Sequence, residues 1–363
     1  MNLVNLLTML IWLGELSLSS WVLSYGAEHL SIKFGAKFVG RTLLSIATTL
    51  PEIAIVIYAS SIGLYDVAIG SGLGSNILMM TLGLALMLLI ATTSLSKSPL
   101  KKLDVSSFKT DKIFLLVSAV LSAILLINGY NYIDGFIFTG IFVGYILIAF
   151  MEMKKEKKLN SRADKSSYAN TVNKLLDPPS FPSPTISDSS FEHRVEVNKS
   201  EMIKAILAFA IGTIGIVIGA NPFITSLQSF SFDIGVSTVV LAVIISPIAG
   251  EMPEKISMMV LARKGAAGAS IAIANVLGSK VLNNSLLLGI AIFAAMYHGG
   301  FYTIITNNAV LSFQMILATS ITLIALIPLF RQSIGIRVGA FLLGLYVLSL
   351  IIQFVNPGVV KLH

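Results

Sequence analysis

Long, uninterrupted runs of apolar residues constrain the fold of this chain more than any other feature. Ten runs of spanning length lie at about 3–25, 36–62, 66–93, 113–129, 133–151, 202–220, 234–262, 267–296, 309–330 and 335–355. A bilayer-spanning helix needs about 20 apolar residues, and a chain inside lipid must satisfy its backbone hydrogen bonds internally. The sequence therefore predicts an all-α, polytopic membrane protein with ten transmembrane helices.

The composition excludes most soluble functions. Of the 363 residues, 55% are apolar and 12% are charged, whereas a soluble domain has roughly 25% charged residues. The net charge of +7 does not indicate nucleic-acid binding, because the Lys and Arg residues of polytopic proteins collect in cytoplasmic loops. We therefore expect the lipid bilayer as the main partner and no nucleic acid, and the sequence leaves the oligomeric state open.

The basic residues also predict an orientation. If the N-terminus lies outside, all but three of the 25 Lys and Arg residues fall in loops on the inner side. The loops on the outer side, around 63–66, 129–134, 221–233 and 297–308, contain none. By the positive-inside rule, both termini are expected outside. We expect the plasma membrane as the location.

The segment 153–200 separates five predicted helices from five others. It has few large apolar residues and many Pro, Ser and charged residues, which is typical of a flexible cytoplasmic loop. Its acidic residues lack calcium-loop spacing, so an ion-sensing role is the less favoured alternative. The chain thus divides into halves at 1–152 and 201–363. An odd number of helices per half means that any internal repeat must be inverted.

Such a repeat is visible in the sequence. The first copy, about 38–93, contains SIATTLPEIAIVIYASSIG and AIGSGLGSNILMMTLG. The second copy, about 236–296, contains PIAGEMPEKISMMVLARKG and AIANVLGSKVLNNSLLLG. Each copy places a Pro-Glu pair near the middle of an apolar run. Because a proline inside a helix frees the carbonyl four residues earlier, here those of Ala47 and Ala249, we expect broken helices at mid-membrane.

The polar residues of the repeat predict a cation site. Ser45, Thr48, Thr49 and Glu52 share one helix face, because their spacing is i, i+3, i+4 and i+7. A carboxylate at the bilayer centre costs about 3 kcal/mol, and carboxylate, hydroxyl and carbonyl oxygens are the ligands of hard cations. A single proline is more often a kink and a single serine a packing residue, but two inverted copies favour function. The predicted ligands are Ser45, Thr48, Thr49, Glu52, Ser75, Gly250, Glu251, Glu254, Ser279 and Asn283.

The motifs resemble those of a known family. TTLPE followed by GSGLGSN is similar to the alpha-repeat signature of the calcium/cation antiporter superfamily, whose sodium/calcium exchangers carry Gly-Thr-Ser-Leu-Pro-Glu and a downstream Gly-Ser-Asn. INGYNYIDG at 127–135 resembles the family's turn between its fourth and fifth helices. The resemblance implies ten helices in two inverted five-helix repeats and ions bound at mid-membrane. It also implies Glu52 and Glu254 as paired calcium ligands, assisted by Thr48, Thr49, Ser75, Ser279 and Asn283.

The second copy departs from the family pattern. Gly250 and Glu251 stand where the Thr-Ser pair is expected, and Lys280 replaces the Asn after Gly-Ser. Pro247 occupies the position of Ser45, and in the first copy Met79 replaces a polar residue. These departures put the family's flanking sodium sites in doubt more than its central divalent site.

Three further charged residues have alternative interpretations. Glu251 and Lys255 are spaced i, i+4, which suits either a structural ion pair or a titratable gate. Lys280 either points into the cavity or extends towards the membrane surface. Glu15 is expected to face a cavity or to bond Ser17 or Ser19.

The resemblance implies secondary active transport by alternating access. The expected activity is exchange of Ca²⁺, or a similar divalent cation, for H⁺ or Na⁺, with no cofactor, and the clustered carboxylates favour H⁺. The alternative is a transport-inactive or channel-like relative. An enzyme is not expected, because the four His residues lie in loops or at the terminus and the chain has neither a His-Glu-x-x-His motif nor a P-loop.

Overall fold

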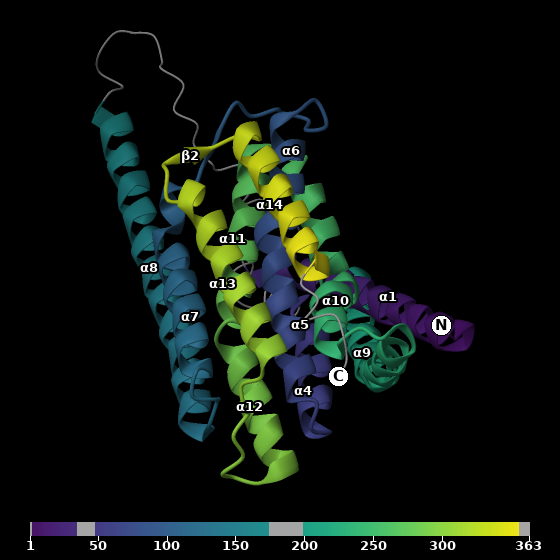
Figure 1. Ribbon diagram of the computed structural model, residues 1–363. Helices are drawn as coiled ribbons and strands as arrows, with labels where there is room; N and C mark the ends of the chain where they lie inside the picture. The colour runs from purple at the N-terminus through teal and green to yellow at the C-terminus, as the bar shows by residue number, and fades with distance from the viewer. Residues whose placement is uncertain (1, 35–47, 174–198, 356–363) are drawn as a thin grey trace.

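The described part of the chain is a bundle of helices (Figure 1). The computed structural model describes residues 2–34, 48–173 and 199–355. All ten predicted runs coincide with a described helix over at least part of their length, which confirms the all-helical fold class. The helices are α1 (Leu3–Phe34), α4 (Leu50–Ser61), α5 (Tyr65–Leu78), the π-helix η2 (Met79–Gly83), α6 (Leu84–Thr92), the 3₁₀ helix η3 (Ser106–Phe108), α7 (Lys109–Leu126), α8 (Tyr132–Asn173), α9 (Lys199–Ile234), α10 (Thr238–Ala262), α11 (Ala266–Asn283), α12 (Leu286–Gly299), α13 (Ala309–Leu329) and α14 (Ile336–Val355).

Seven described helical segments are long and apolar enough to cross a membrane. Shorter apolar helices occur at Leu50–Ser61 and Thr238–Glu251. The count of ten transmembrane helices and the inverted repeat therefore stay predictions. The seven segments are Leu3–Gly26, Tyr65–Thr92, Tyr132–Glu152, Met202–Ile234, Gly268–Gly299, Ala309–Leu329 and Ile336–Val355.

Burial separates central helices from peripheral ones. The most apolar windows of Tyr65–Thr92 and Gly268–Gly299 are 78% and 83% buried within the protein, whereas those of α1 and α9 are only 22% buried. The helices α5, α6, α11 and α12 therefore form the centre of the bundle. Helices α1 and α9 pack against each other and lie together at one side, tilted away from the central helices (Figure 1).

The breaks in regular helix differ from those expected at the prolines. Pro51 lies in the first turn of α4, where a missing N–H costs no helical hydrogen bond, and Ala47 lies outside the described residues. Helix α10 continues through position 253. The predicted breaks occur instead one helix further along, where η2 interrupts the span after α5 and where α11 ends before α12.

Two predicted loops are partly helical. Helix α8 continues to Asn173, so the first part of the expected flexible loop 153–200 is a helix. Helix α9 continues across the expected outer loop 221–233, with Pro222 inside it. Its extension carries Phe223, Ile224 and Leu227, which are fully buried. Burial of these side chains offsets the helix-breaking effect of the proline.

Short backbone contacts join the two halves outside the helices. The strands β1 (Leu103–Asp104) and β2 (Ser333–Ile334) pair antiparallel, with Leu103 opposite Ile334. A single bridge pairs Tyr130 with Ile305, so the turn after α7 contacts the loop after α12. Both contacts connect segments that are far apart in the sequence.

Candidate functional site

The predicted ligands lie on four neighbouring helices near the centre of the bundle. Of the ten, Ser45 lies outside the described residues, and the other nine are buried. They come from the start of α4, from α5, from α10 and from α11. The structure therefore gathers residues of both sequence copies among α4, α5, α10 and α11, which pack on one another.

A close backbone approach sets α5 against α10. A Cβ atom at Gly74 would lie 1.9 Å from the carbonyl oxygen of Val243, so only glycine fits at this crossing. Small residues at helix crossings are the usual way in which membrane helices come into contact. Because Ser75 follows Gly74 directly, the crossing places the Ser75 hydroxyl beside the polar residues of α10 and α11.

Ser75 is the centre of a buried polar network that contains an ion pair. Its hydroxyl donates a hydrogen bond to Glu251 Oε1 and accepts from Lys280 Nζ and Asn283 Nδ2, both at 2.6 Å. Lys280 also forms an ion pair with Glu251. A hydroxyl has one donor and two acceptor sites, so the hydrogen-bonding capacity of Ser75 is fully used.

This network decides between the alternatives for Lys280. The side chain is fully buried and points into the site rather than towards the membrane surface. Within the described residues, Glu251 forms its ion pair with Lys280 of α11 rather than with Lys255, one turn further along α10. Glu251 therefore has its direct partner on another helix, while Lys255 acts on it electrostatically.

The second carboxylate, Glu254, has neutral partners. Its Oε1 accepts hydrogen bonds from Ser279 Oγ at 2.9 Å and from Asn275 Nδ2 at 3.0 Å. Asn275, Ser279 and Asn283 follow one another at i+4 along α11, so they form a polar stripe on one helix face. Asn275 is not among the predicted ligands, although its i+4 spacing from Ser279 is the signal that identifies it.

The third carboxylate, Glu52, lies over the backbone of α10. A Cβ atom at position 250 would be 2.5 Å from Glu52 Oε1, so Gly250 provides the space that this carboxylate occupies. Glu52 Oε2 is buried without a hydrogen-bond partner. Glu251, Lys280 and Glu254 act on Glu52 through their charges, and so does Lys255. Gly250 thus contributes space to the site rather than a side-chain ligand.

Several buried acceptors remain without a partner in this region. They include Glu52 Oε2, Glu251 Oε2 and Asn283 Oδ1. A buried carboxylate oxygen without a donor is costly unless a cation or a proton compensates it. Within the described residues no group of three His, Cys, Asp or Glu side chains is arranged to hold a metal.

The remaining predicted residues are buried around the network. Thr48 and Thr49 lie at the start of α4, where the Thr49 carbonyl accepts a hydrogen bond from Ile53 N. Met79 is fully buried at the start of η2. Near the network, Asn76 Nδ2 donates to Asn284 Oδ1 at 2.8 Å and so joins α5 to the end of α11, a contact that the sequence analysis did not predict.

Glu15 lies away from this centre, on α1. Its Oε1 accepts a hydrogen bond from Ser19 Oγ at 2.7 Å, which confirms one of the expected contacts, whereas Ser17 bonds the carbonyl of Leu13. A Cβ atom at Gly219 of α9 would lie 1.8 Å from Glu15 Oε2. Glu15 therefore belongs to the contact between α1 and α9.

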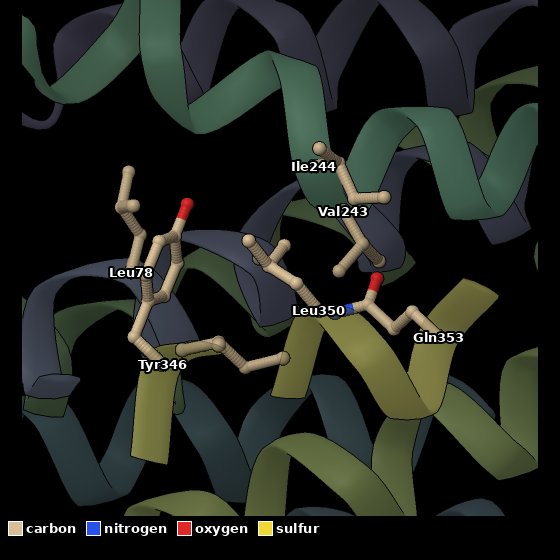
Figure 2. A pocket seen from close by; sticks show the side chains of 8 residues that line it. Leu78, Val243, Ile244, Tyr346, Leu350 and Gln353 are labelled. Carbon is tan, nitrogen blue, oxygen red and sulfur yellow. The ribbon is translucent and has the colours of Figure 1, made fainter. Parts of the chain in front are cut away.

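A small cavity lies beside the polar network but is distinct from it. Figure 2 shows Tyr346, Leu350 and Gln353 of α14 facing Val243 and Ile244 of α10. Most of its lining is apolar, and it contains none of the predicted ligands. The cavity lies between α14 and the crossing of α5 and α10.

Comparison with solved structures relates this fold to cation exchangers. A structure described as the H⁺/Ca²⁺ exchanger CAX superposes with a TM-score of 0.73 at 19% identity and covers 98% of this chain and 82% of its own. A structure of the sodium-calcium exchanger NCX_Mj superposes with a TM-score of 0.58 at 20% identity and covers 97% of this chain and 99% of its own. At these identities the likeness establishes the fold.

Sequence comparison establishes the family. The "Sodium/calcium exchanger MaX1" of Methanosarcina acetivorans is 28% identical over 365 aligned residues, which are 97% of this chain and 99% of that protein. The "Uncharacterized membrane protein MJ0091" of Methanocaldococcus jannaschii is 22% identical over 72% of each chain. The family model "Sodium/calcium exchanger protein" matches residues 4–151 and 204–355. Since these matches cover both halves, the chain belongs to the sodium/calcium exchanger protein family.

Proposed function

We propose that this protein is a secondary antiporter that exchanges Ca²⁺, or a similar divalent cation, for H⁺ or Na⁺ by alternating access. The observation that carries the proposal is the burial of Glu52 and Glu254, both 2% exposed, on α4 and α10, which come from different halves of the chain. A carboxylate at the bilayer centre costs about 3 kcal/mol, so two of them are retained for a function. Two carboxylates balance the charge of one divalent cation.

The neutral groups around these carboxylates suit a divalent ion. Ser279 and Asn275 hold Glu254, while Asn283 Oδ1 and Glu52 Oε2 are buried acceptors without partners. Ca²⁺ takes six to eight oxygen ligands and tolerates irregular geometry. Thr48, Thr49 and the backbone carbonyls nearby are the further oxygens that we propose as ligands.

The site residues also support the proposed topology of ten helices in two inverted halves. The Pro-Glu residues occupy α4 and α10, and the Gly-Ser residues occupy α5 and α11. We place the first half at 1–152, the second at 201–363 and both termini outside. The chain has no native Cys. Single cysteines introduced at positions 165 and 302 can therefore be tested for labelling from the inner side and from the outer side separately. Labelling of position 302 only from inside would contradict the orientation.

Flux measurements test the proposed activity. Purified protein in proteoliposomes should take up radiolabelled Ca²⁺ against its gradient when an outward gradient of H⁺ or Na⁺ is imposed. Testing Na⁺, K⁺ and H⁺ gradients separately identifies the counter-ion. Glu52→Gln and Glu254→Gln should each abolish exchange while the protein stays folded. The amide keeps the shape of the carboxylate side chain but loses the negative charge that balances the divalent cation. Glu152→Gln, the same change on α8, is the matched control and should leave exchange intact.

A second candidate is a relative that does not exchange cations. The observation that favours it is the Lys280 ammonium, which already occupies part of the polar network. The same vesicles separate the two candidates. Uptake against a Ca²⁺ gradient requires an exchanger, whereas downhill leak, or no flux with folded protein, indicates a channel-like or inactive relative.

A further inference from the structure

Lys280 is the feature of the site that the proposed function leaves unexplained. Its ammonium group is fully buried near the centre of the bundle, donates to Ser75 Oγ at 2.6 Å and pairs with the carboxylate of Glu251. Lysine is almost never fully buried without a specific reason. The two oxygens that hold it come from α5 and α10.

The surroundings of the ammonium have the chemistry of a monovalent cation site. A hydroxyl oxygen and a carboxylate oxygen contact it directly, and Asn283 donates to the same hydroxyl. Asn283 Oδ1 and Glu251 Oε2 are buried acceptors without partners. Oxygens of these types are the usual ligands of hard cations.

The balance of charge among the buried residues also fits a monovalent cation at the position of the Lys280 ammonium. Glu52, Glu251 and Glu254 interact electrostatically with one another and with Lys280. Because Lys280 neutralises Glu251 through the ion pair, two carboxylates remain to balance one divalent cation. Lys255 acts on the same carboxylates from its position on α10, but no hydrogen bond or ion pair within the described residues joins it to them.

We propose that the Lys280 ammonium is a built-in cation that occupies a monovalent cation subsite formed by the Ser75 hydroxyl and the Glu251 carboxylate. The role of Lys280 in transport that this inference implies rests on the proposed function. A monovalent ion and the ammonium compete for the same two oxygens, and the lone pairs of Ser75 are already used. The tethered charge therefore excludes a free monovalent ion from this subsite and leaves Glu52 and Glu254 for the divalent ion.

The alternative is a purely structural ion pair, and thermal unfolding separates the two. In Lys280→Ala the ammonium is removed and Glu251 is left without its partner, so Na⁺, K⁺ or Li⁺ can enter the vacated subsite. Ligand binding to the folded state raises the melting temperature. We expect at least one of these ions to raise it by about 3 °C over choline at equal ionic strength. The wild type should gain less from that ion, because its ammonium already fills the subsite.

Two further variants isolate the cause of this effect. Lys255→Ala removes a nearby buried lysine that does not contact Ser75 and should acquire no cation-dependent stabilisation. Lys280→Ala combined with Glu251→Gln removes both charges and should lose the cation effect, because the subsite then lacks its carboxylate. This double variant also avoids an unpaired buried charge, so it should fold if the single variant does not.

Each outcome has a definite meaning. Equal melting of Lys280→Ala in all four salts would overturn the proposal, and so would a stabilisation of Lys280→Ala by Na⁺, K⁺ or Li⁺ that is no larger than that of the wild type. If Lys280→Ala fails to fold in every salt while the double variant folds, the pair is structural and the proposal is also overturned. Calcium flux is not part of this readout, so failure of the proposed function remains distinguishable from failure of this inference.

Discussion

Gly250→Ala tests whether the space over α10 positions Glu52 for cation binding. The new methyl group would lie 2.5 Å from Glu52 Oε1, whereas ordinary contacts begin at 3.4 Å. The carboxylate must therefore retreat by about 0.9 Å, while metal–ligand distances vary by only about 0.2 Å. Because the displaced atoms form the end of a side chain, the fold should survive at a cost of about 1–3 kcal/mol. Loss of positioning around a metal ligand typically costs roughly tenfold or more in affinity.

The assay is the calcium dependence of flux in proteoliposomes. We expect the half-saturating Ca²⁺ concentration of Gly250→Ala to rise about tenfold or more. Gly344→Ala on α14 is the matched control, because a Cβ atom there meets nothing within 4 Å. An unchanged half-saturating concentration in Gly250→Ala would refute the reasoning.

A shorter carboxylate should relieve the collision. Glu52→Asp withdraws the carboxylate by one methylene group and leaves room for the methyl at position 250. Combining Glu52→Asp with Gly250→Ala should therefore be little worse than Glu52→Asp alone, since mutations of residues in contact are not additive. If the two effects simply add, the methyl group acts by some route other than the Glu52 carboxylate.

Three further changes test the fold and the network. Gly74→Ala should prevent folding, because its Cβ atom would overlap the backbone of Val243; recovery of folded protein by size-exclusion chromatography would contradict this. Ser279→Ala removes one of the two hydrogen bonds described for Glu254 Oε1 and should weaken Ca²⁺-dependent flux about tenfold, measured as half-saturation. Deletion of about 160–195 should leave transport measurable, because this segment contains few large apolar residues; complete loss of folded protein would show that it is a structural domain.

The sequence predicted the elements of the fold where apolar runs were long and continuous. Each run overlaps a described helix over at least part of its length, because long apolar stretches favour helices in a membrane. Helix ends were harder to predict. The run 202–220 predicts a helix followed by an outer loop at 221–233, but the buried side chains of this segment extend α9 to Ile234. Similarly, α8 extends beyond the apolar run to Asn173 through polar residues.

Contacts within one helix were predictable at the site, and contacts between helices were not. The i, i+4 stripe through Ser279 and Asn283 follows from spacing alone. The partner of Glu251 depends on how α10 and α11 lie beside each other, and no local sequence pattern indicates that arrangement. Helical spacing alone therefore pointed to the nearby Lys255. Gly250 was interpreted as a lost hydroxyl, because the approach of Glu52 to α10 is visible only in three dimensions.

The departures from the family pattern depend on one another in the structure. A Thr or Ser at position 250 would collide with Glu52, so the loss of a hydroxyl there gives the Glu52 carboxylate its position. Glu251 adds a negative charge, and Lys280 neutralises it through an ion pair that shares the Ser75 hydroxyl. Removing either member alone would leave a buried charge without its partner, which is more costly than removing both. Loss of function by random substitution has no reason to produce charges that balance. The balanced charges of the second copy therefore support the proposed exchanger over an inactive relative.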